Sequence, residues 1–150
     1  MKDNILLLLR FLIAAIFIVS GTEKLMSPAE NFLYVLQAYN VFPDILARFF
    51  AVGFPWMELS LGVFMAVGLW LRLSLLAVAC VSSSFILVVG QAIVRKLPID
   101  NCGCFGSLVH LPLHGVIFLD TAILLSALAC FFHISSVRRF SLDNKFDAIL

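Results

Sequence analysis

The sequence predicts an all-α integral membrane protein, a bundle of four transmembrane helices that forms a single domain. Hydrophobic residues make up 63% of the 150-residue chain and charged residues 13%, which is more apolar surface than a soluble domain of this length buries. Four apolar runs reach the roughly 20 residues that a membrane-crossing helix needs, and most of the charges stand between these runs. A net charge of +1 without a basic stripe argues against a nucleic-acid partner.

The four spans are expected at about residues 5–21, 49–71, 73–94 and 112–132, with a polar tail at 133–150. The run Thr22-Glu23-Lys24 ends the first span and is expected to anchor it at the outer surface. Trp70-Leu71-Arg72 predicts a tight turn between the second and third spans. Pro112 suits the first turn of the fourth span, because a proline there removes no helical hydrogen bond.

A shorter helix is predicted between the first two spans. In residues 28–44, the apolar side chains Phe32, Leu36 and Tyr39 recur at helical spacing among polar positions such as Glu30. This pattern is typical of an amphipathic helix that lies on a membrane surface or caps a bundle.

The distribution of basic residues predicts which side of the membrane each loop occupies. Four spans place both termini and the turn at 70–72 on one side, which carries six Lys and Arg residues against four on the other. This bias favours cytoplasmic termini in a multi-pass protein of the bacterial inner membrane. The loop between the third and fourth spans, and the amphipathic helix with it, would then lie on the outer, oxidising face.

That loop, residues 97–111, carries the most distinctive chemistry of the chain, Cys102 and Cys104 separated by one glycine. Disulfide exchange needs an accessible thiolate, and the positive field of Arg95 and Lys96 favours one. Cysteines one residue apart close only a small strained ring, which makes a disulfide easier to reduce. The pair is therefore the candidate catalytic site of a thiol-disulfide oxidoreductase.

Two alternatives stay open for this loop. Soft and borderline ligands suited to Cu(I), Zn or Hg(II) follow one another at the spacing C-x-C-x5-H-x3-H, in Cys102, Cys104, His110 and His114. The spacing matches no strong zinc signature, and the histidines stand on either side of Pro112. With these ligands the protein would be a membrane carrier of a soft metal or sulfur species. Without either chemistry it would be a non-catalytic scaffold subunit.

Five charged or thiol side chains fall inside the predicted spans: Arg10, Glu58, Cys80, Asp120 and Cys130. An unpaired charge in a bilayer is costly, so Arg10 is expected to pair with Glu58 or Asp120. The pair would either fix the helix register or form a proton-accessible, substrate-polarising site. The two cysteines are expected to be packing residues.

Three stretches of the sequence resemble a known family. Arg10-Phe11, followed by residues 20–25, is similar to the opening helix of DoxX-like membrane proteins, and residues 55–58 with Gly62 resemble their second helix. Cys102-Gly103-Cys104-Phe105-Gly106, followed by Asp120, resembles the methylamine utilisation MauE branch of that superfamily. The resemblance implies a four-helix inner-membrane protein associated with disulfide formation or maturation of exported proteins, often beside a thioredoxin-like partner.

We therefore expect an inner-membrane thiol-disulfide exchange protein that supports the redox maturation of exported proteins through Cys102 and Cys104. Its partners would be the lipid bilayer and an exported thioredoxin-like protein or another cysteine-containing client. A catalytic cycle needs an electron acceptor, for which a quinone in the bilayer is a candidate, although no motif identifies one.

Overall fold

The computed structural model describes residues 2–41, 43–96, 112–138 and 141. In these residues every regular element is a helix: α1 (Lys2–Met26), α2 (Ala29–Ala38), α3 (Asp44–Val67), α4 (Leu71–Val94), α5 (Leu113–Phe132) and α6 (Ile134–Val137). Four of them, α1, α3, α4 and α5, are long and apolar enough to cross a membrane. The predicted all-α bundle with four spans is confirmed.

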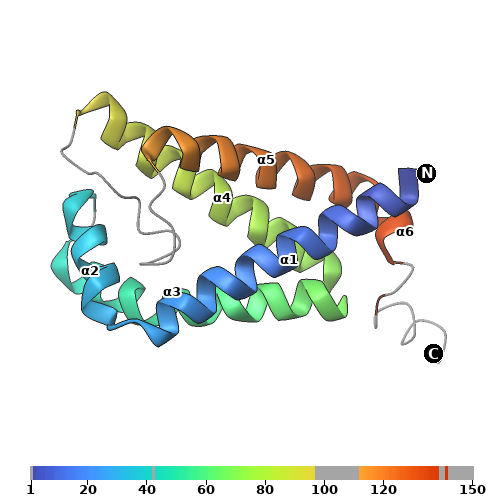
Figure 1. Ribbon diagram of the computed structural model, residues 1–150, viewed down its shortest axis with the longest axis horizontal. Helices are drawn as coiled ribbons and strands as arrows, with labels where there is room; N and C mark the ends of the chain where they lie inside the picture. Colours follow the sequence, from blue (N-terminus) through green and yellow to red (C-terminus); the bar gives the residue numbers. More distant parts are fainter. Residues whose placement is uncertain (1, 42, 97–111, 139–140, 142–150) are drawn as a thin grey trace.

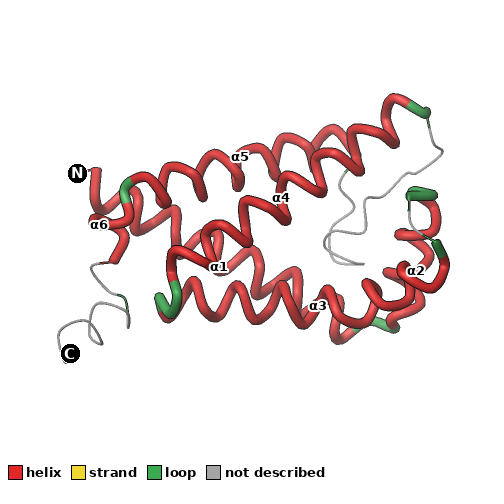
Figure 2. Tube along the Cα trace, turned by 180° about the vertical axis from the view of Figure 1, so that it is seen from behind, coloured by secondary structure: helices red, strands yellow, loops and turns green. Residues whose placement is uncertain are grey.

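The long helices form two pairs that run up and down. Figure 1 shows α1 along α3 and α5 along α4. The pairs meet where α1 contacts α5 and where α3 contacts α4. The N-terminus, α6 and the turn between α3 and α4 lie at one end of the bundle (Figures 1 and 2). At the other end lie α2 and the ends of α4 and α5 that flank residues 97–111. We call this second end the α2 end.

The second span is displaced from its predicted position at 49–71, because α3 begins at Asp44 and ends at Val67. Its first residues include Asp44 and Arg48, so a hydropathy pattern does not identify them as membrane-spanning. Its end is fixed by Gly68, whose φ of +74° is left-handed and whose N–H donates to the carbonyl of Phe64 at 2.8 Å. The turn is therefore Gly68 to Trp70, and Leu71 already begins α4.

Close contact between α1 and α3 depends on two glycines. A Cβ on Gly21 would lie 2.7 Å from the backbone nitrogen of Leu59, and one on Gly62 would lie 2.8 Å from that of Ile18. Lipid solvates apolar side chains as well as protein does, so helices in a bilayer associate through van der Waals contact and hydrogen bonds. Glycine at these positions lets the two backbones approach and brings polar side chains of α1 and α3 face to face.

Arg10 connects helices at the end of the bundle opposite the α2 end. The side chain is fully buried, and Nε donates to the carbonyl of Met65 at 2.7 Å. Nη2 donates to Ala66 at 2.9 Å and Nη1 to Val137 at 3.0 Å. These carbonyls belong to the last turns of α3 and α6, which lack helical partners and attract a cation. Arg10 thus connects three helices.

α2 packs against the start of α3. Its buried residue Phe32 contacts Phe54, with ring centroids 6.0 Å apart. Gln37 Nε2 donates to Asp44 Oδ1 at 3.0 Å, which joins the end of α2 to the first turn of α3. α2 therefore caps the bundle at this end, as predicted, and its contact with a membrane surface stays a prediction.

Candidate functional site

The predicted site residues divide between the described and undescribed parts of the chain. Cys102, Cys104 and His110 lie outside the described residues, whereas His114 is described and lies exposed in the first turn of α5. Within the described residues, no group of three or more His, Cys, Asp or Glu side chains is arranged to hold a metal ion. The soft-metal site stays a prediction, because most of its ligands fall outside this part of the chain.

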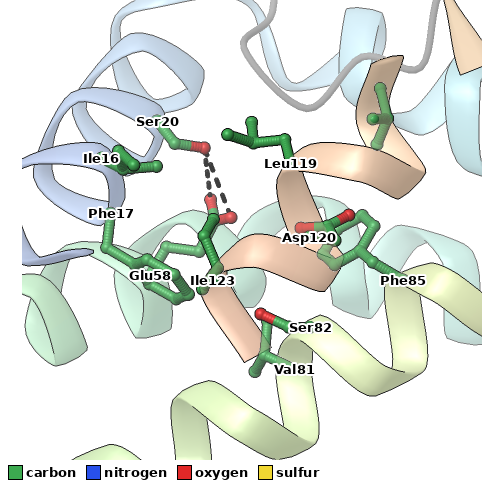
Figure 3. A pocket seen from close by; sticks show the side chains of 11 residues that line it. Ile16, Phe17, Ser20, Glu58, Val81, Ser82, Phe85, Leu119, Asp120 and Ile123 are labelled. Carbon is green, nitrogen blue, oxygen red and sulfur yellow. Dashed lines mark hydrogen bonds between the residues drawn. The ribbon is translucent and has the colours of Figure 1, made fainter. Parts of the chain in front are cut away.

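A buried ion pair joins the last turn of α1 to α3. Lys24 Nζ donates to Glu58 Oε2 at 2.8 Å and to Ser20 Oγ at 2.7 Å. Ser20 Oγ in turn lies 3.3 Å from Glu58 Oε1, as the dashed lines in Figure 3 show. Lys24 is 4% and Glu58 5% exposed. Two opposite charges and a hydroxyl thus satisfy one another away from solvent.

Helix geometry explains how Lys24 reaches into the bundle. Residues four apart share a helix face and side chains lean toward the N-terminus, so Lys24 folds back over Ser20. The ring of Phe32 covers the ammonium, whose Nζ lies 5.4 Å from the ring centroid. The expectation that Glu23 and Lys24 face the outer surface is therefore wrong, since Glu23 is only 7% exposed and Lys24 is enclosed.

The expected pairing of Arg10 with Glu58 or Asp120 is also wrong. Arg10 donates to Met65, about two helical turns along α3 from Glu58. A guanidinium with five donors is better satisfied by several carbonyls at helix ends than by one carboxylate in the bundle interior. The carboxylate of Glu58 instead pairs with Lys24, in the last turn of α1.

A small cavity separates the ion pair from α4 and α5. Its volume is about 30 Å³, and each long helix gives it one polar side chain: Ser20 from α1, Glu58 from α3, Ser82 from α4 and Asp120 from α5. Figure 3 shows these side chains around a common space. Within the described part of the chain, Ser82 Oγ and Asp120 Oδ2 are buried and have no hydrogen-bond partner. We call this the polar cavity.

An apolar groove of about 420 Å³ lies beside the polar cavity, between α2, α3 and α4. Its aromatic wall includes Phe32, Phe54 and Phe85, and the last two rings meet edge to face at 5.4 Å. Phe85 lines both spaces. Cys80 also lines the groove and is exposed, which differs from the packing role expected of it, whereas Cys130 is fully buried. The lining suits an apolar molecule, and the quinone stays a hypothesis.

The sequence pattern missed three members of the polar cavity and its ion pair: Ser20, Lys24 and Ser82. A signal for the first two was present, because Ser20 and Lys24 stand at i and i+4 on a helix that also carries Gly21. No such signal singles out Ser82 from its neighbours Ser83 and Ser84, which donate to carbonyls of their own helix. Only the packing of α4 against α5 turns Ser82 inward.

Comparison with known proteins gives a family. The family model described as methylamine utilisation protein MauE matches residues 2–133, which include the four long helices and all of residues 97–111. No curated protein and no solved structure matches the chain. The predicted MauE resemblance is confirmed, while the wider DoxX-like relationship and the role of the cysteine motif stay predictions.

Proposed function

This chain belongs to the methylamine utilisation protein MauE family, and from that membership we propose that it is a thiol-disulfide exchange protein acting through Cys102 and Cys104. The observation that carries the proposal is the cysteine pair itself, spaced by one residue in the connection from α4 to α5. The other two cysteines belong to membrane-spanning helices. A four-span membrane protein of this family thus has one place where two thiols can react together.

In the proposed reaction, one thiolate of the pair attacks a sulfur of a client disulfide. A mixed disulfide forms and the first client thiolate leaves. The second cysteine of the pair then attacks the mixed disulfide, which closes the Cys102–Cys104 bond and releases the second client thiolate. Two electrons pass from the pair to the client, and the reverse sequence oxidises a client dithiol. The client is therefore the electron partner in both directions.

The surroundings of the connection support this chemistry. α4 and α5 pack against each other, and both of the ends that residues 97–111 join lie at the α2 end. Arg95 and Lys96, which directly follow α4, are exposed. Positive charge near a thiol favours the thiolate, which is the nucleophile in exchange.

The same proposal assigns a place and a partner. The membrane is the bacterial inner membrane, the termini are cytoplasmic, and the Cys102 loop is on the outer face, where disulfides persist. The client is an exported thioredoxin-like protein or another exported protein with cysteines. The two described ends of the chain lie together, opposite the α2 end, which supports one shared side for both termini. The excess of Lys and Arg on that side supports the cytoplasm as its location.

Trapping of the mixed disulfide tests the proposal. In Cys104→Ser, Cys102 is left without its resolving partner, so mixed disulfides with exported proteins accumulate and disappear on reduction. Cys102→Ser gives the reciprocal experiment. The matched controls Cys80→Ser and Cys130→Ser remove thiols from the spans and leave the trapped species unchanged. If neither loop variant traps a client, while the protein binds Cu(I) or Zn with dependence on His114, the exchange function is contradicted.

A further inference from the structure

The polar cavity is unusual because it lies inside the membrane-spanning part of the bundle. Its polar lining comes from all four long helices, and its remaining walls are apolar. A space of about 10–15 Å³ is enough for one water, so a cavity of this size holds about two. An apolar void of the same size would stay empty, whereas hydroxyls and carboxylates give water its hydrogen bonds.

Two polar atoms of the cavity point to a bound molecule. Ser82 is 1% exposed, and its Oγ has no hydrogen-bond partner among the described residues. Asp120 Oδ2 is buried and unpartnered in the same way. Figure 3 shows both side chains turned toward the space that Glu58 and Ser20 close from the other side. Buried polar atoms are nearly always hydrogen-bonded, which indicates that a small bound molecule supplies the hydrogen bonds of these two atoms.

The charges around the cavity do not balance. The Asp120 carboxyl interacts electrostatically with two charged groups, the carboxylate of Glu58 on α3 and the ammonium of Lys24 on α1. Its other polar neighbours around the cavity, Ser20 on α1 and Ser82 on α4, are uncharged. Lys24 is held at hydrogen-bond distance by Glu58. Two ionised carboxylates and one ammonium would leave a net negative charge in a low-dielectric interior, which costs several kcal/mol.

We propose that the polar cavity is a proton-binding site between the four long helices, in which water bridges Asp120 to Glu58. The proton resides on Asp120, which donates to the water. The water donates in turn to the Glu58 carboxylate, and Ser82 Oγ is its third partner. One bound proton makes the group of Asp120, Glu58 and Lys24 neutral. The site joins the α1–α3 pair to the α4–α5 pair, and it does not depend on the cysteines.

Infrared spectroscopy of the purified full-length protein in detergent tests the site. We expect the absorption band of a protonated carboxyl group near neutral pH, and a shift of this band in heavy water. Asp120→Asn removes the band, and Ser82→Ala shifts it, because the water loses a partner. The matched control Glu30→Gln removes an exposed carboxyl from α2 and leaves the band unchanged.

Three further measurements make each outcome decisive. Asp120→Glu keeps a carboxyl and moves the band, so it replaces Asp120→Asn if circular dichroism shows that the latter has lost helix. The double variant of Cys102→Ser with Cys104→Ser keeps the band, which separates this site from the exchange function. A wild-type spectrum without the band overturns the proposal, as does a band that persists in Asp120→Asn. Sodium binding at Asp120 without a protonated carboxyl identifies a cation site and overturns it too.

Discussion

Two buried cations of this bundle are stabilised in different ways. Lys24 carries a compact ammonium and meets one carboxylate and one hydroxyl. Arg10 carries a planar guanidinium and meets the carbonyls of two helix ends. The number and direction of the donors explain the choice, because a guanidinium can serve several fixed acceptors at once. Residue type and environment therefore match at both sites.

Replacement of Arg10 tests the carbonyl contacts. Arg10→Met keeps much of the apolar volume but leaves the helix-end carbonyls buried without a donor, so we expect a loss of about 3 kcal/mol in the free energy of unfolding. Denaturant titration of the purified protein measures it. Arg72→Met, at an exposed position of the same end, is the control and changes stability by less than about 0.5 kcal/mol. Equal effects of the two substitutions would contradict the role of Arg10.

The buried ion pair predicts non-additive substitutions. Lys24→Met alone leaves Glu58 as an unpaired charge and is expected to cost about 3–5 kcal/mol. Glu58→Met alone leaves the Lys24 ammonium buried without its carboxylate, at a similar cost. The double variant costs less than the sum, because neither charge remains. The free energies of unfolding of the wild type, the two single variants and the double variant form a double-mutant cycle. Costs that simply add would show that the two side chains act independently.

At the scale of helices, contact between α1 and α3 rests on small residues. Gly62→Ala forces a Cβ against the backbone of α1, so we expect a loss of about 1–3 kcal/mol. Gly53→Ala, in the same helix, is the matched control, because nothing lies within 4 Å of its Cβ position. It should be neutral or slightly stabilising, since alanine favours a helix over glycine. Unfolding of both variants is measured side by side, and equal stability would refute the close approach.

The helices were predictable from sequence to within a few residues, and their ends show where prediction stops. Hydropathy places the third and fourth spans well, because α4 at 71–94 and α5 at 113–132 are apolar nearly throughout. It misplaces α3, whose first turn contains Asp44 and whose end depends on the left-handed Gly68. A window of average hydropathy detects neither a charged first turn nor a single backbone angle.

The partners of the buried charges were not predictable in the same way. Glu58 and Asp120 are recognisable as polar residues inside spans, and both line the polar cavity. Which cation meets Glu58 depends on how α1 crosses α3, and that crossing is set by Gly21 and Gly62 rather than by charge. Arg10 and Lys24 are equally plausible from sequence, and only the packing of the two helices distinguishes them.

On the scale of the whole molecule, the bundle has two chemically different ends. The turn at Gly68 to Trp70 and the Arg10 contacts lie at one end, and residues 97–111 connect helices at the other. The polar cavity lies between them and is lined by the four long helices. An up-and-down bundle thus keeps the cysteine connection and the terminal contacts on opposite sides of a membrane.

This arrangement predicts the sidedness of thiol labelling. In intact cells, a charged, membrane-impermeant maleimide should label Cys102 and Cys104, because the proposed orientation places their loop outside. It should spare Cys80 and Cys130 in the spans. A thiol introduced by Arg72→Cys at the opposite turn should react only after the cells are opened. Mass spectrometry of the labelled protein gives both results, and the reverse pattern would invert the proposed orientation.

The most direct test of the exchange function is the thiol state of the loop pair. The protein, in membranes equilibrated at stepped ratios of reduced to oxidised glutathione, is trapped with an alkylating agent and analysed by mass spectrometry. We expect Cys102 and Cys104 to lose their free thiols together in one reversible two-electron transition, which either single serine variant abolishes. Two thiols that stay free at every ratio, or that titrate independently of each other, would contradict the proposed function.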